Sequence, residues 1–124
     1  IEDIHMIGSF EFAKVVVGTK ILVVMGHTSC GAVKGACADV KLDNLTHLLS
    51  EIRPAVELVE TRHPNTDVCA DPHVDEIAEE NVIRTIKDIR AKSQAITDLE
   101  EKGDLIVVGA MYDVSTGKVR FLEI

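Results

Sequence analysis

The sequence predicts an α/β fold, a mostly parallel central sheet flanked by helices in three layers. Two short apolar runs, residues 21–25 and 105–111, have the length and β-branched content of strands that are buried on both faces. Segments with apolar residues at helical spacing separate these two runs, and strands that alternate with helices usually form a parallel sheet. A Ser-Thr-Gly turn at residues 115–117 then leads into residues 118–122, so we expect this last strand to be antiparallel to its neighbour.

Helical segments fill most of the remaining sequence. Residues 1–7 are expected to be a lead-in, after which Ser9 is a candidate N-cap for a helix that Gly18 ends. Pro54 is expected to kink or break a later helix, because proline removes a backbone hydrogen-bond donor. The later helices are expected over residues 43–59, 72–92 and 93–102.

Composition limits the class of protein. A chain of 124 residues makes a single domain, residues 1–124, with room for a hydrophobic core. Its net charge of -8 argues against nucleic acid as a partner. No apolar run approaches the ~20 residues of a membrane helix, so we expect no membrane partner either. Three widely spaced cysteines do not suggest a disulfide framework, and a thiolate metal site in a reducing, cytoplasmic compartment accounts for them better.

The stretch that indicates chemistry follows the first apolar run, where His27 and Cys30 form an H-x-x-C pattern. Open α/β sheets place their sites at the carboxyl ends of such strands. Imidazole nitrogen and thiolate sulfur are donors that zinc prefers, and the spacing lets both side chains reach one ion. Two ligands alone do not make a site, however. The alternative, that His27 caps the turn and Cys30 is a small buried hydrophobe, stays open on these residues.

The other histidines and cysteines are expected to be structural or to lie at the surface. Cys37 is a poor substitute for a missing ligand, because it lies two helical turns beyond Cys30, about 10 Å along a helix axis. Loop residues and a proline separate the two most tempting extra ligands, Cys69 and His73. The remaining residues in this group are His5, His47 and His63.

Three blocks of the sequence resemble the β-class carbonic anhydrases. The segment GHTSCGAVKGA, which begins at Gly26, resembles the second zinc-ligand motif of that family. Residues 8–13, GSFEFA, resemble the helix that precedes the motif's strand, and residues 103–122 resemble the closing strand, turn and strand. The blocks occur in the family's order and cover nearly the whole chain.

The resemblance implies an enzyme that uses Zn²⁺ for the reversible hydration of carbon dioxide to bicarbonate and works as a homodimer or higher oligomer. It implies that His27 and Cys30 are two of the three protein ligands of the zinc. It further implies that Gly31 offers a backbone N–H to the substrate or bicarbonate. Phe12 would line the substrate pocket, at a position where the family usually has tyrosine. The helix that carries Phe12 would face a partner subunit.

One family motif is absent. The third zinc ligand belongs to a C-x-D-S-R motif, which also supplies a catalytic Asp–Arg pair, and these 124 residues do not contain it. The resemblance places this motif before residue 1, so we expect a β-carbonic anhydrase-like domain that lacks its N-terminal strands and is inactive alone, with no catalytic residue in the chain. Its uncovered sheet edge and apolar face would favour self-association.

Two alternatives stay open at this stage. The chain would instead be a metal-free relative with a structural or oligomerising role, or a hydrolase of carbonyl sulfide or carbon disulfide on the same scaffold. The resemblance fits all three interpretations, and pocket shape, which separates the two enzymes, cannot be read from the sequence.

Overall fold

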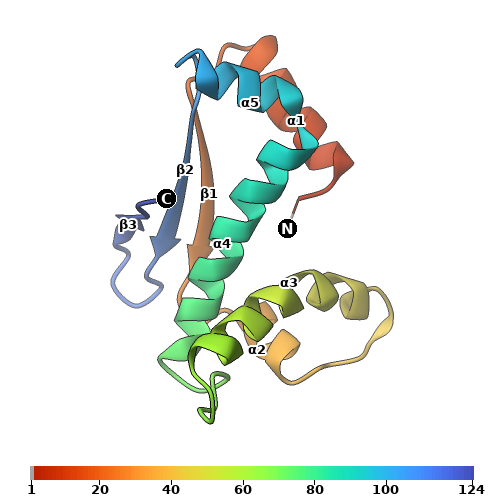
Figure 1. The fold of residues 1–124 in the computed structure, drawn as a ribbon, viewed down its shortest axis with the longest axis vertical. Helices are drawn as coiled ribbons and strands as arrows, with labels where there is room; N and C mark the ends of the chain where they lie inside the picture. The colour runs from red at the N-terminus through yellow and green to blue at the C-terminus, as the bar shows by residue number, and fades with distance from the viewer. Residues whose placement is uncertain (1) are drawn as a thin grey trace.

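A computed structural model describes residues 2–124 as an α/β fold with a three-stranded sheet (Figure 1). The strand order is β1-β2-β3, with β1 parallel to β2 and β2 antiparallel to β3, as the sequence predicted. The strands are β1 (Ile21–His27), β2 (Ile106–Tyr112) and β3 (Val119–Phe121). The helices are α1 (Ile4–Val15), α2 (Gly31–Cys37), α3 (Asp43–Arg62), α4 (His73–Lys92) and α5 (Gln94–Glu101).

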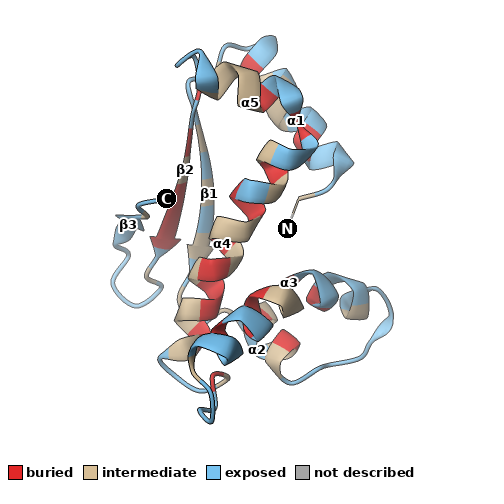
Figure 2. Cartoon of the chain, in the orientation of Figure 1, coloured by how far each residue is buried: buried red, intermediate tan, exposed pale blue. Residues whose placement is uncertain are grey.

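Helix α4 packs against one face of the sheet and forms the centre of the core (Figure 2). Its Ile77, Ile86 and Ile89 are at most 1% exposed. Two strand glycines let the helix come close: Cβ atoms built at Gly26 and Gly109 would lie 2.8 and 3.1 Å from methyl carbons of Val82. The absence of a side chain at these two positions therefore sets the distance between α4 and the sheet.

The opposite face of the sheet is open, and this corrects two predictions. β1 is an edge strand, and its residues alternate between exposed and partly buried instead of being buried on both faces. Ile21, Val23 and Met25 are 41–53% exposed. Within residues 2–124 no helix covers this face, so the described chain has two layers, not three (Figure 1). An apolar run indicates that a strand is covered by neighbouring strands and helices. It does not show that the same chain supplies them.

The first helix begins earlier than predicted. Asp3, not Ser9, is the N-cap of α1, and its carboxylate accepts hydrogen bonds from the backbone N–H groups of His5 and Met6, both at 2.9 Å. These bonds satisfy two of the donors that a helix start leaves unpaired. The Ser9 hydroxyl instead donates to the carbonyl oxygen of His5 inside the helix.

The three later helices form where the sequence predicted them, within a few residues at their ends. α3 continues unbroken through Pro54, so the expected break does not occur. α4 carries acidic side chains in its first turn and basic ones in its last, which matches the helix dipole. Ser93 caps α5 by accepting the N–H of Ile96 at 3.3 Å. None of the helices within residues 2–124 has the length and apolar content to cross a membrane.

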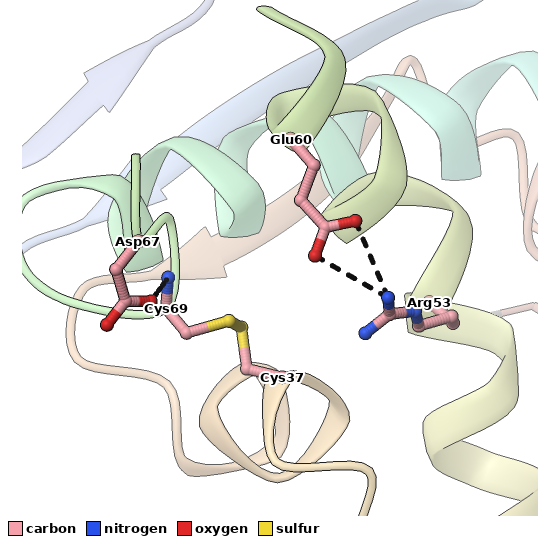
Figure 3. The surroundings of a disulfide bond; sticks show 5 residues. All are labelled: Cys37, Arg53, Glu60, Asp67 and Cys69. Atoms are coloured by element: carbon pink, nitrogen blue, oxygen red, sulfur yellow. Dashed lines mark hydrogen bonds and ion pairs between the residues drawn. A yellow bond between two sulfur atoms is a disulfide. The ribbon is translucent and has the colours of Figure 1, made fainter. Parts of the chain in front are cut away.

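A disulfide joins Cys37, the last residue of α2, to Cys69 in the loop between α3 and α4 (Figure 3). The prediction that the cysteines form no disulfide is therefore wrong. The two residues are 32 positions apart, but α3 and its following loop fold back over α2 and bring their Cα atoms to 5.6 Å. The Asp67 carboxylate accepts the N–H of Cys69 at 3.0 Å and helps to hold this loop.

The close contact at Gly26 gives a test of the packing. Gly26→Ala would place a methyl group 2.8 Å from both the Met111 sulfur and a Val82 methyl carbon. We expect this overpacking to lower the free energy of unfolding by about 1–3 kcal/mol, measured by urea denaturation. The matched control is Gly8→Ala in α1, where nothing lies within 4 Å of the added carbon. This control should raise stability by up to about 1 kcal/mol, because alanine favours helix more than glycine does.

Candidate metal centre

The turn between β1 and α2 is held from two sides. The N–H of Thr28 donates to the carbonyl oxygen of Tyr112 at 2.9 Å, and the N–H of Val114 donates to the Thr28 hydroxyl at 3.0 Å. On the other side, the N–H of Ser29 donates to the Asp75 carboxylate in α4 at 2.8 Å. The end of β2 and the first turn of α4 together fix the backbone between His27 and Cys30.

Ser29 adopts a left-handed backbone conformation with φ of 55°. A residue with a side chain occupies this region at a cost of roughly 1–2 kcal/mol, so the surrounding contacts must favour it. The hydrogen bond that the Ser29 N–H donates to Asp75 is the contact that does so. Asp75 thus shapes the turn through the backbone of Ser29.

His27 presents one ring nitrogen for a metal. Its Nδ1 lies 2.9 Å from the carbonyl oxygen of Thr28, which can only accept a hydrogen bond, so Nδ1 carries the proton. The lone pair then belongs to Nε2, the arrangement typical of histidines that bind metals. The side chain is exposed and follows Met25 on the open face of the sheet.

Cys30 provides a second donor in the same turn. It is the N-cap residue of α2, its side chain makes no capping hydrogen bond, and its thiol is free. Both Cys30 and His27 line a cavity of about 160 Å³ whose other walls are largely apolar. Imidazole nitrogen and thiolate sulfur fit zinc. That the two share one ion stays a prediction.

A third protein ligand is not found within residues 2–124. No other His, Cys, Asp or Glu in this part of the chain joins His27 and Cys30 to complete a metal-binding group. Cys37 and Cys69 are bound to each other, so neither thiol can serve. The donors present fit zinc chemically, but they number one fewer than the three protein ligands that catalytic zinc sites have.

The two predicted pocket residues lie in different parts of the molecule. Gly31 begins α2 next to Cys30 and is exposed, and nothing lies within 4 Å of a Cβ built on it. Phe12 lies on α1 and is 58% exposed. Helix α1 lies at the end of the sheet where β1 begins (Figure 1). Phe12 does not line the cavity of His27 and Cys30, so its pocket role would need a second copy of the chain.

Asp75 is the residue that sequence reasoning missed. It stands in the acidic first turn of α4. The sequence pattern there indicates solvent-exposed carboxylates that interact favourably with the positive end of the helix dipole. The acidic run gives no sign that one of its members reaches back to a turn 46 residues earlier. Only the packing of α4 across the end of β1 brings Asp75 to Ser29.

Comparison with known proteins points to one family. The family profile described as carbonic anhydrase matches residues 2–119. Carbonic anhydrase 2 of Mycobacterium tuberculosis is 32% identical over 121 residues, covering 94% of this chain and 55% of its own length. This chain spans about half the length of the curated relatives it matches.

Solved structures agree with the sequence comparison. The β-carbonic anhydrase CafA of Aspergillus fumigatus superimposes with a TM-score of 0.83 at 29% identity, over 98% of this chain and 57% of that one. A structure described as one of two tetrameric β-carbonic anhydrases from Sordaria macrospora also gives 0.83, at 24% identity, over 98% of this chain and 61% of that one. The second likeness bears on the fold alone.

The hydrogen bond from Ser29 to Asp75 can be tested directly. Asp75→Ala removes the acceptor, so we expect the Ser29 amide to exchange with deuterium faster and the protein to lose about 1–2 kcal/mol of stability. Asp75→Asn keeps an oxygen acceptor and serves as the control, with exchange close to the original rate. Equal exchange in the alanine and asparagine variants would mean that the carboxylate does not hold the turn.

Proposed function

The chain belongs to the β-carbonic anhydrase family, and from this premise we propose that it is the part of a zinc-dependent carbonic anhydrase that contributes His27 and Cys30 to the metal. The reaction is the reversible hydration of carbon dioxide to bicarbonate and a proton. The observation that supports this best is the state of His27. Its Nδ1 donates to the Thr28 carbonyl oxygen, so in the neutral ring Nε2 offers the lone pair, and the free thiol of Cys30 lines the same cavity.

A bound zinc would supply the nucleophile, because zinc lowers the pKa of a bound water from far above neutral to about 7. His27 and Cys30 would hold the ion, and Val24 and Val33 of the same cavity would contribute apolar walls that suit a small non-polar substrate. The N–H of Gly31 would donate a hydrogen bond to the bicarbonate that forms.

The third protein ligand would reach this site along the open edge of β1. Parallel strands bring their carboxyl ends to the same edge of a sheet. A strand paired with the free side of β1 would therefore end beside His27, the last residue of β1. The cysteine of the family's C-x-D-S-R motif is the ligand we propose for that position.

A second copy of the chain is the proposed partner for the exposed apolar surface. Val15, Val16 and Val17 at the end of α1 are 66–69% exposed, and Phe12 precedes them on the same helix. Exposed apolar groups that adjoin one another mark interaction sites more often than single ones do. The tetrameric assembly described for the Sordaria macrospora enzymes makes an oligomer a reasonable proposal for this chain.

We expect the 124-residue chain alone to hydrate carbon dioxide at a negligible rate, even when loaded with zinc. With two protein ligands the ion binds weakly, and the Asp–Arg pair of the missing motif is not there to act with it. Stopped-flow measurement of carbon dioxide hydration checks this, with a full-length family member as the positive control. A rate near that of the control, abolished by Cys30→Ser, would mean that another residue completes the site.

Self-association gives a second expected outcome. Light scattering at high protein concentration should report a mass above the 13.5 kDa of one chain. Val16→Glu places a charge in the proposed contact and should shift the population toward monomer. Lys102→Glu, at an exposed position after α5, is the control and should leave the mass unchanged. A monomer at all concentrations for the original chain would overturn the proposal of a homo-oligomer.

A further inference from the structure

A second group of potential metal ligands lies where α3 meets α4, and it includes neither His27 nor Cys30. Its members are His63, the residue after α3, His73, the first residue of α4, and Glu76, one turn further along α4. One ligand atom from each lies within 4.8 Å of the others. The sequence predicted His63 as solvent-facing and His73 as structural or surface, but both are partly buried and face the same carboxylate.

The distances within this group are close to those of a zinc site. His63 Nε2 lies 2.9 and 3.1 Å from the two carboxylate oxygens of Glu76, and His73 Nδ1 lies 3.1 Å from Oε2. Two donors that each lie about 2.0–2.1 Å from a tetrahedral zinc are about 3.3 Å apart. A cation could therefore replace the shared protons with small movements of the two rings.

Two imidazole nitrogens and one carboxylate oxygen form a donor set that zinc uses in known sites, where a water takes the fourth position. The side chains of His63, His73 and Glu76 are 20–36% exposed, which leaves a path for an ion and room for that water. The ring centroids are 4.4 Å apart. Two protonated imidazoles this close would repel each other, whereas two neutral rings are suited to bind one cation.

The guanidinium group that approaches Glu76 is bound mainly to another carboxylate. Arg62 pairs mainly with the buried Glu80, at 2.8 Å, and approaches Glu76 only to 3.8 Å. The start of α4 carries roughly half a unit of positive charge from the helix dipole, which opposes a cation. Four carboxylates, of Asp75, Glu76, Glu79 and Glu80, lie in the first two turns of α4. Glu80 pairs with Arg62 and Glu79 with Arg120, so Asp75 and Glu76 are the two that offset the dipole.

Ionisation of Glu76 is favoured at neutral pH. Partial burial raises the pKa of this carboxyl group, but the hydrogen bonds and charges of His73 and His63 outweigh burial and hold its pKa below the usual value. The carboxylate is thus available as an anionic ligand.

The loop that joins the two histidines is held in place. The disulfide between Cys37 and Cys69 anchors its centre (Figure 3). The N–H of Thr66 donates to the carbonyl oxygen of His63 at 3.2 Å, and the N–H of His73 donates to that of Ala70 at 3.0 Å. Both ligand-bearing ends of the loop are therefore ordered before any ion binds, which lowers the entropic cost of binding.

We propose that His63, His73 and Glu76 form a second zinc-binding site, in which the two rings and the carboxylate hold one Zn²⁺ and a water completes the coordination. This site joins the end of α3 to the start of α4. It does not depend on the function proposed for His27 and Cys30, because it shares no ligand with them.

The test uses the full 124-residue chain with His27→Ala and Cys30→Ser, which removes the first pair of donors. We expect this double variant to bind one equivalent of zinc in a competition titration against a chelating dye, without thiol reductant so that the disulfide stays intact. Adding Glu76→Gln should weaken binding at least tenfold. Adding His47→Ala, an exposed histidine of α3 outside the group, should leave the affinity unchanged. Failure of the double variant to bind zinc, or equal loss in the Glu76 and His47 variants, would overturn the proposal.

A second measurement keeps His63, His73 and Glu76, the three ligands proposed for this site, in place. Cobalt(II) added to the same double variant should give visible d–d bands without a cysteinate-to-cobalt charge-transfer band. Zinc should shift the ring resonances of His63 and His73 in nuclear magnetic resonance spectra and leave those of His5 and His47 in place. Equal shifts of all four histidines would indicate non-specific binding and would contradict the site.

Discussion

The close approach of α4 to the sheet is the constraint on which the rest of the molecule depends. It requires that Gly26 and Gly109 carry no side chain where Val82 meets the strands. With α4 held there, its first turn lies beside the end of β1 and Asp75 reaches the N–H of Ser29. The far end of the helix leads into Ser93, whose hydroxyl donates to Glu11 of α1 at 2.6 Å. One packed surface thus positions both the turn after β1 and the N-terminal helix.

The sequence predicted the strands, their relative directions and most helices, because these follow from local patterns: apolar runs, spacing of 3.6 residues and turn residues. It also identified His27 and Cys30 as candidate ligands and suggested an uncovered edge. It did not predict the Cys37–Cys69 bond, the link between Ser29 and Asp75, or the meeting of His63 with His73 and Glu76. Each of these joins residues that only tertiary packing brings together, and no local pattern encodes that.

Part of the exposed apolar surface gathers on one face of the sheet, where Ile21, Val23 and Met25 of β1 are exposed. The register pairs Ala110 with Phe121 and Tyr112 with Val119, which extends the open face of β1 across all three strands. Arg120 lies on the other side of β3 and pairs with Glu79 of α4. The two faces of one small sheet therefore have different roles: one forms the core with α4, and the other presents apolar side chains to whatever adjoins the chain.

The disulfide has a topological consequence. By joining residues 37 and 69 it closes a covalent ring that contains all of α3 and the exposed segment after it. A peptide bond cut within this ring, for example by a protease at the exposed turn of residues 64–67, leaves the two pieces linked through sulfur. A cut in the backbone there would leave α2 and α4 covalently joined by the disulfide. The molecule would therefore stay in one piece although its main chain is broken in this region.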